Sequence, residues 1–73
     1  MHFQIIMDTS GEARHHFDPA DASTVSEAEK RFRDLVGAGF IAAKRTGNGT
    51  SELVRRFDLA ARETVFIPRL VGG

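Results

Sequence analysis

The chain ends in the segment ETVFIPRLVGG, in which an apolar run leads through Pro68 and Arg69 to two glycines. Glycine has no Cβ atom, so Gly72 and Gly73 can adopt backbone conformations that other residues avoid. When extended, the segment from Pro68 to Gly73 spans about 17 Å, enough to carry a terminal carboxylate away from a folded domain. The first chemistry that the sequence suggests is therefore chemistry at its carboxyl end.

Three histidines are the other candidate side chains. His2 and His16 are expected together on the outer face of a first hairpin, and His15 at the rim of the core. A catalytic zinc site needs three protein ligands, and no third ligand is evident, so we expect no metal. No serine, aspartate or glutamate stands in a recognisable catalytic spacing, and a domain of this size has little room for a substrate pocket. We expect neither an enzyme nor a bound cofactor.

The composition indicates one small domain that is stabilised by packing. The 73 residues are near the lower limit for independent folding, and the absence of cysteine excludes disulfides and thiolate metal sites. Apolar residues make up 41% of the chain and include six phenylalanines, enough for one core. No segment approaches the ~20 apolar residues of a membrane span, and no signal-peptide pattern opens the chain. We expect a soluble, cytoplasmic protein.

The net charge is zero, but the charges are unevenly distributed. Residues 1–39 hold four basic and seven acidic side chains, whereas residues 40–73 hold six basic and three acidic ones. The half that bears the tail is therefore positive. Because the overall charge is zero and no exposed aromatic residues are expected to interleave with the basic ones, we expect no nucleic-acid binding. We expect a monomer whose partners are proteins.

The segments HFQIIMD and ARHHF alternate as two strands of a hairpin. A three-residue loop, Thr9 to Gly11, would place the large apolar groups on one face, with Phe3 opposite Phe17 and Ile5 opposite His15. A two-residue loop would shift the pairing by one residue and spoil that match. We therefore predict the three-residue loop.

A helix is predicted after the turn segment DPADAST. Asp18, Asp21, Ser23 and Thr24 are all possible caps, and Thr24 forms a capping box with Glu27. The apolar residues then recur at helical spacing: Val25, Ala28, Phe32, Leu35 and Val36. The glycines of residues 37–39 end the helix.

The segments FIAAKR and SELVRRF flank Asn48-Gly49, a strong signal for a two-residue type I′ turn. That turn pairs Arg45 with Glu52 and Ala43 with Val54. Residues 58–62 are predicted as a turn or a single helical turn, and ETVFIP as a last strand that Pro68 ends. The order ββαβββ predicts an α+β fold of the β-grasp type, a mixed sheet with one helix packed across one face. We assign residues 1–68 to this domain and residues 69–73 to a flexible C-terminal tail.

The two ends of the chain resemble the ubiquitin-like family. MHFQIIMDTSGEARHHFDPADASTVSEAEKRFRDLVGAG is similar to the opening of that family, and ETVFIPRLVGG is similar to its close. The middle hairpin resembles the family only loosely. The same layout and terminal Gly-Gly occur in bacterial sulfur carriers of thiamine and molybdopterin synthesis. Small uncharacterised bacterial and phage-associated proteins have a similar tail.

The resemblance implies that the carboxylate of Gly73 is adenylated by an activating enzyme that uses ATP, and then passes to a thiol or sulfur donor. Gly72 and Gly73 would enter the channel of that enzyme, and Arg69, Leu70 and Val71 would guide the tail. Pro68 departs from most ubiquitin-like tails, although proline also occurs there in sulfur carriers. Only Lys30 and Lys44 could accept a further copy, so chain building is poorly supported.

The second hairpin has apolar residues on both predicted faces. By volume we place the face with Phe40 and Phe57 inward, which leaves Ile41 and Val54 as an exposed patch rimmed by Arg45 and Arg56. Such a patch is expected to bind protein partners. We interpret the following arginines as ordinary solvated residues, the alternative being a positive collar around the tail: Arg55, Arg56, Arg62 and Arg69.

Two functions remain open from the sequence. The first is a ubiquitin-like protein that presents its Gly-Gly end for conjugation or sulfur transfer. The alternative is a non-catalytic interaction or adaptor module, associated with a mobile element or phage, whose tail has no chemistry.

Overall fold

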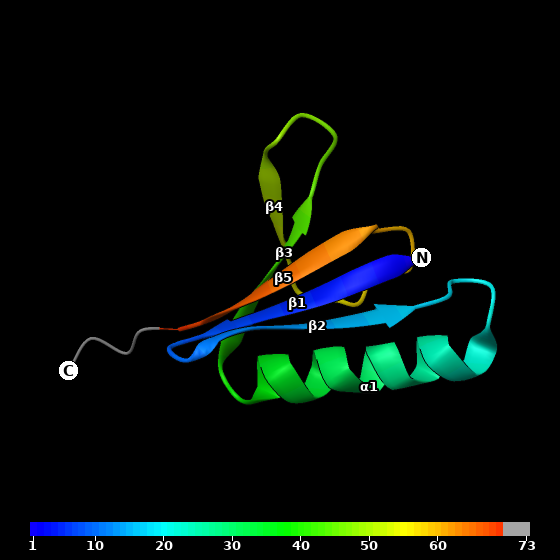
Figure 1. Cartoon of the computed structure of the whole chain (residues 1–73), viewed down its shortest axis with the longest axis horizontal. Helices are drawn as coiled ribbons and strands as arrows, with labels where there is room; N and C mark the ends of the chain where they lie inside the picture. The colour runs from blue at the N-terminus through cyan, green and yellow to red at the C-terminus, as the bar shows by residue number, and fades with distance from the viewer. Residues whose placement is uncertain (70–73) are drawn as a thin grey trace.

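The computed structural model describes residues 1–69 as an α+β fold with six elements (Figure 1). In chain order these are β1 (His2–Asp8), β2 (Gly11–Phe17), α1 (Ala22–Gly37), β3 (Phe40–Arg45), β4 (Ser51–Val54) and β5 (Glu63–Pro68). The predicted order ββαβββ is confirmed. Within the described residues, no helix has the length and apolarity needed to cross a membrane.

The five strands form one mixed sheet in the order β2-β1-β5-β3-β4. β1 and β5 run parallel, and the other neighbouring strands are antiparallel. Parallel strands need a long crossover, and the chain supplies it by passing through β2, α1, β3 and β4 between β1 and β5. α1 lies across one face of the sheet (Figure 1), as predicted, and we call the opposite side the open face.

The first hairpin has a two-residue turn, so the predicted three-residue loop was wrong. Asp8 pairs with Gly11, and Thr9 and Ser10 form the turn. The Asp8 carboxylate accepts hydrogen bonds from the backbone N–H of Ser10 (2.7 Å) and from its hydroxyl (2.6 Å). These bonds lower the pKa of Asp8, and Gly11 adopts the positive φ of 133° that follows the turn.

This register decides which side of β1 faces the helix. Phe17 pairs with His2, not with Phe3, so it lies on the helix side together with Gln4 and Ile6. Phe3 and Met7 lie on the open face and are 37% and 39% exposed. The predicted inward face of β1 was therefore the outward one.

The second hairpin is also shifted by one residue, but its loop is longer than predicted whereas the first loop is shorter. Arg45 pairs with Ser51 and Ala43 with Leu53, so the predicted type I′ turn at Asn48-Gly49 was wrong. Thr46 donates its backbone N–H to the carbonyl of Thr50 (2.9 Å), and the two threonine hydroxyls are hydrogen bonded. The loop is therefore Gly47, Asn48 and Gly49, and Gly49 takes the left-handed conformation (φ 74°).

Helix α1 begins earlier than the capping box predicted. Asp21 is the N-cap, and its carboxylate accepts the backbone N–H of Ser23 at 3.0 Å. Thr24 instead accepts the N–H of Asp18 and donates its hydroxyl to the Asp18 carbonyl, which ties the preceding turn to the helix. The predicted end is confirmed, since α1 stops at Gly37 and Gly39 adopts φ 101°.

The core lies between α1 and the sheet and is built around aromatic rings. Phe32 of α1 and Phe66 of β5 are both buried and meet edge to face, with ring centroids 5.6 Å apart. Phe57 packs against Phe32 at 6.0 Å and against Phe17 at 5.8 Å. The segment between β4 and β5 thus closes the part of the helix-side face that α1 does not reach.

Adjacent residues of β5 provide a direct test of this layering. Phe66→Ala should lower the free energy of unfolding by about 3–5 kcal/mol, because it opens a cavity in the core. Ile67 lies on the open face and is 47% exposed, so Ile67→Ala should cost about 1 kcal/mol or less. Urea denaturation followed by circular dichroism measures both. Equal losses in the two variants would contradict the assignment of the two faces.

Candidate functional site

The predicted functional end of the chain begins where β5 leaves the sheet. β5 ends at Pro68, as predicted, at the end of the sheet that also carries the β1–β2 turn (Figure 1). Arg69, the next residue, is exposed. The other predicted tail residues lie outside the described residues: Leu70, Val71, Gly72 and Gly73.

A hollow of about 550 Å³ lies beside the end of β5. Its walls are mostly apolar and come from the end of α1, from β3 and from β4, with Phe40, Ile41 and Leu53 among them. Arg55 and Arg69 line the same hollow. The structure therefore brings these two arginines together next to apolar surface, close to the start of the tail.

The other two arginines of the alternative collar lie elsewhere. Arg56 lines a separate hollow on the helix side, together with Phe32 and Glu29. Arg62 precedes β5, so the full length of that strand separates it from Arg69. All four arginines are exposed, as predicted for ordinary solvated residues, and they do not gather at Arg69, so the alternative of a collar is not supported.

The open face carries an apolar surface that we call the open-face patch. Its members come from four strands and are each 37–72% exposed: Phe3, Met7, Ile41, Leu53 and Ile67. The register places Ile5, Val65 and Ala43 between them. Clusters of exposed apolar side chains often mark binding surfaces for proteins.

The structure divides the predicted docking residues between the two faces. Ile41 is 40% exposed and Arg45 lies on the same face, where its Nε is 3.7 Å from a carboxylate oxygen of Glu63. Val54 pairs with Ala42 and packs against the core, so its predicted exposure beside Ile41 was wrong. Arg56 lies on the helix side and does not rim Ile41. The one-residue shift of the hairpin explains both errors.

Four members of the open-face patch were not predicted as docking residues: Phe3, Met7, Leu53 and Ile67. A signal for Leu53 and Ile67 was present, because ETVFIP and SELV place apolar residues on both of their faces. Phe3 and Met7 were assigned to the core by the wrong register.

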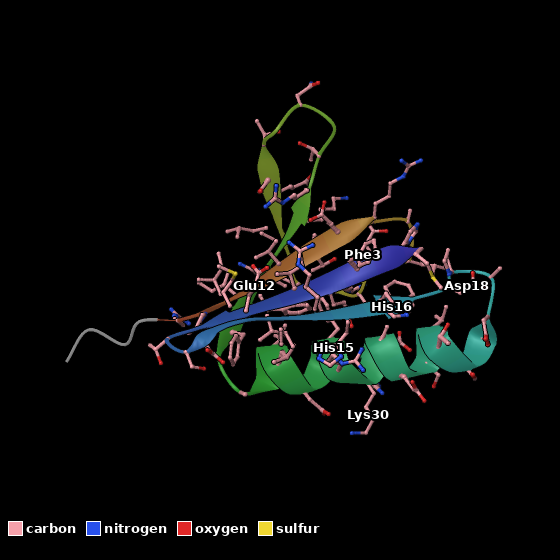
Figure 2. The ribbon with its side chains drawn as sticks, in the orientation of Figure 1. Phe3, Glu12, His15, His16, Asp18 and Lys30 are labelled. Atoms are coloured by element: carbon pink, nitrogen blue, oxygen red, sulfur yellow. The ribbon has the colours of Figure 1, made fainter. Side chains whose placement is uncertain are left out.

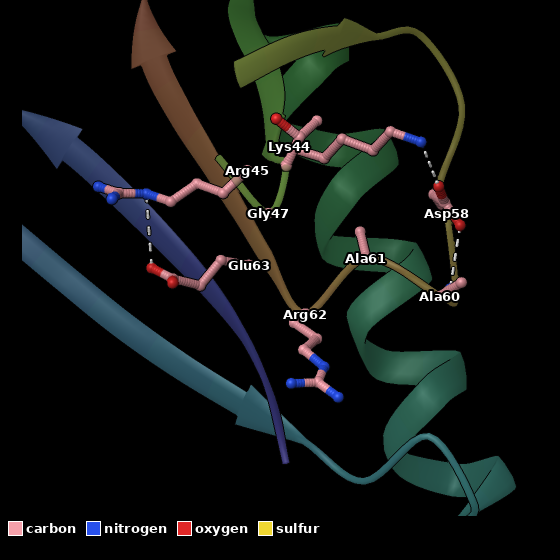
Figure 3. A pocket seen from close by; sticks show the side chains of 9 residues that line it. Lys44, Arg45, Gly47, Asp58, Ala60, Ala61, Arg62 and Glu63 are labelled. Atoms are coloured by element: carbon pink, nitrogen blue, oxygen red, sulfur yellow. Dashed lines mark hydrogen bonds and ion pairs between the residues drawn. The ribbon is translucent and has the colours of Figure 1, made fainter. Parts of the chain in front are cut away.

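A second hollow of about 550 Å³ is polar and lies at the opposite end of the sheet (Figure 3). Lys44 donates to the carboxylate of Asp58 at 2.9 Å, and Asp58 also accepts the backbone N–H of Ala60. The hydrogen bond from Lys44 lowers the pKa of Asp58, and the same bond raises the pKa of Lys44. We interpret this ion pair as a structural contact that holds the turn of residues 58–62 against β3. The turn itself was correctly predicted.

A buried polar contact joins α1 to the sheet. Gln4 is 1% exposed and donates its side-chain N–H to the carbonyl of Ala28 at 2.9 Å. Arg31 in turn donates to the side-chain oxygen of Gln4 at 2.8 Å. His15 pairs with Gln4 across the hairpin and lies between β2 and α1 (Figure 2). Burial, Arg31 and the neighbouring His16 lower the pKa of His15 below its ordinary value of 6.5.

The three histidines do not converge on one site. His2 lies on the helix side, where its Nδ1 is 3.1 Å from the carbonyl oxygen of Leu59. His16 lies on the open face beside Phe3, so the prediction of a shared outer face with His2 was wrong. Among residues 1–69, no three side chains of histidine, aspartate or glutamate gather in a way that could hold a metal ion.

A comparison of the chain with protein-family models, curated proteins and solved structures found no match.

The position of His15 predicts a pH dependence of stability. At pH 7.5 the side chain is neutral in both the folded and the unfolded chain. As the pH falls through 6.5 the unfolded chain binds a proton first, so the free energy of unfolding decreases, and the loss levels off below the lowered pKa of the folded state. Urea denaturation at pH 7.5 and 5.5 should show lower stability at pH 5.5 and a smaller difference in His15→Gln.

His16→Gln is the matched control, because it removes the adjacent imidazole on the open face and leaves His15 in place. It should retain most of the pH dependence. If the dependence is the same in His15→Gln as in the unaltered chain, the assignment to His15 is incorrect.

Proposed function

We propose that this chain is a ubiquitin-like protein of the β-grasp type that presents Gly72-Gly73 for activation by ATP, followed by conjugation or sulfur transfer. The parallel pair β1 and β5 at the centre of the sheet and the single helix across one face support the β-grasp assignment. We assign this role to the cytoplasm, and we assign no catalytic site to the chain itself.

The observation that carries the proposal is the position of the last strand. β5 is the middle strand of the sheet, and Arg69, which follows its end, is exposed at the rim of the molecule. A segment that follows Arg69 can extend about 3.3–3.6 Å per residue from that rim. Leu70 and Val71 would then lead the glycine pair into the channel of an activating enzyme.

The chemistry would take place on the carboxylate of Gly73. One of its oxygens attacks the α-phosphate of ATP, pyrophosphate leaves, and an acyl adenylate forms. A thiol or sulfur donor then displaces AMP. The role of this chain is to present an unhindered end, since a Cβ atom at either of the last two positions would meet the walls of a narrow channel.

The surface for the activating enzyme would lie beside the tail. Arg55, Arg69 and Ile41 line the apolar hollow. Arg45 lies on the same face as Ile41, but at the opposite end of the sheet, and would extend the surface away from the tail. An enzyme that docks there would offer apolar side chains and carboxylates.

The open-face patch favours a second candidate function, a binding module that never uses its carboxylate. Exposed apolar residues on four strands suffice to bind a protein partner without chemistry at the tail. The two functions differ in what the loss of Gly72 and Gly73 does, because only the first depends on them.

Incubation of the protein with ATP and a lysate of its own host tests the proposal. Intact-protein and peptide mass spectrometry should detect an adenylate, a thiocarboxylate or an isopeptide remnant at Gly73. The double substitution Gly72→Ala with Gly73→Ala should reduce that product about 100-fold, because misplacement of the reacting atoms by ~1 Å has effects of that size.

Ile67→Ala serves as a comparison for the diglycine variant, since it alters the open face and leaves the tail unchanged. Circular dichroism should show that both variants are folded. If no product forms at Gly73, and a chain that lacks Gly72 and Gly73 still binds the same partners, the carrier proposal fails and the binding module stands.

A further inference from the structure

We propose that Asn48 is a site of spontaneous covalent modification, at which the folded protein loses ammonia and gains a carboxylate. The reaction is deamidation through a cyclic imide, and it needs water but no enzyme. The inference does not rest on the diglycine end, because Asn48 lies in the loop between β3 and β4, beside the polar hollow at the opposite end of the sheet.

The sequence places an intramolecular nucleophile next to this amide. Asn48 is the only asparagine of the chain, and it precedes a glycine. A bond between the side-chain carbonyl carbon of an asparagine and the backbone nitrogen of the next residue closes a small, unstrained ring, and such proximity accelerates a reaction. At most positions the following side chain crowds that nitrogen. Gly49 has no side chain, so its nitrogen is unhindered.

The reaction conserves atoms without any oxidation or reduction. The backbone N–H of Gly49 first loses its proton to a base in solution. The nitrogen then attacks Cγ of Asn48: the N–Cγ bond forms, the Cγ–Nδ2 bond breaks, and Nδ2 takes up a proton and leaves as ammonia. Water then opens the cyclic imide. Cleavage at Cγ gives aspartate, whereas cleavage at the main-chain carbonyl gives isoaspartate, whose backbone runs through Cβ.

The structure leaves the reacting groups exposed. The loop projects from the sheet (Figure 1), and residues 47–49 are all exposed. Its hydrogen bonds are made by Thr46 and Thr50. Among residues 1–69, no hydrogen bond engages the Gly49 N–H or the side chain of Asn48. Neither group therefore has to leave a partner before it reacts.

There is also space around the attacking nitrogen. Apart from the neighbours of Gly49 in the chain, no heavy atom lies within 4 Å of the position that a Cβ atom would take on this residue. The three-residue loop stands outside the ladder of strand pairs, which ends at Arg45 and Ser51. Exposed backbone of this kind changes conformation at little cost in free energy. The folded state should therefore not protect Asn48.

The other side-chain amide of the chain is protected. Gln4 is 1% exposed, its side-chain N–H donates to the carbonyl of Ala28 at 2.9 Å, and its side-chain oxygen accepts from Arg31 at 2.8 Å. The chain has no further glutamine. Loss of ammonia from a side-chain amide of the folded protein is therefore assigned to Asn48.

The product changes the charge beside the polar hollow. The loop borders this hollow through Thr46 and Gly47. Three basic and two acidic side chains also line it: Lys44, Arg45, Arg62, Asp58 and Glu63. A carboxylate at residue 48 lies next to this excess of positive charge. It also makes the net charge of the chain negative instead of zero, so chromatography can separate the modified form.

Incubation of the full chain at pH 7.5 for several weeks tests the proposal. Anion-exchange chromatography should resolve a more acidic form, and peptide mass spectrometry with electron-transfer fragmentation should locate aspartate and isoaspartate at residue 48. The rate should be about tenfold or more higher at pH 9 than at pH 7, because the attacking nitrogen must lose its proton. The folded chain should react within about tenfold of the rate of the chain unfolded in guanidinium chloride, because the loop is already accessible.

Two glycine variants form a matched pair. Gly49→Ala should slow the reaction about tenfold or more, because its methyl group hinders the approach of the attacking nitrogen. Gly47→Ala alters the other side of Asn48, where a Cβ atom also meets nothing within 4 Å, and should leave the rate unchanged. Circular dichroism should show that both variants are folded.

Three results would overturn the proposal. The first is a folded chain that reacts more than about tenfold more slowly than the unfolded chain, which would show that the loop protects Asn48. The second is an equal rate in Gly49→Ala and Gly47→Ala. The third is a modified form whose new carboxylate maps to Gln4. The comparison with the unfolded chain uses the unaltered sequence, so it holds even if Gly49→Ala does not fold.

Discussion

A single helix has to cover a sheet of five strands. An α-helix with its side chains is about 10 Å wide, whereas strands spaced about 4.8 Å apart make five of them roughly 19 Å wide between the outer axes. α1 therefore covers only part of one face, through Ala28 and Phe32. Phe57, from the segment between β4 and β5, covers more of it by packing on Phe17 and Phe32. The opposite face receives no layer from the described residues.

That uncovered face is where the structure departs from an ordinary α+β domain. Antiparallel sheets with one solvated side usually alternate apolar and polar residues, with the polar ones outward. Here β1, β3 and β5 carry apolar residues on both sides, so the open-face patch remains exposed. Arg69 is exposed at the rim, where β5 leaves the sheet.

The burial of polar side chains is restricted to positions where partners are available. Gln4 occupies the centre of the helix–sheet interface because Ala28 and Arg31 satisfy its amide. The same contact holds Arg31 near His15, whose pKa is lowered as a result of burial and of that charge. Lys44 and Asp58 play a comparable role at the edge of the sheet, where they join β3 to the turn before β5. These contacts fix the relative positions of elements that the apolar core alone would hold less specifically.

The sequence by itself determined the order of the elements, the apolar stripe of α1, the glycine end of the helix and the last strand. These features depend on residues within a few positions of one another, and local periodicity reports them directly. The registers of both hairpins were decided only by the tertiary structure. Each turn segment offers acceptable chemistry for two loop lengths, and a shift of one residue exchanges the two faces of a strand. Gln4 finds its partners on α1, 24 and 27 residues away, and Phe17 finds Phe57 across the core. No local pattern could therefore reveal which face of β1 would be buried.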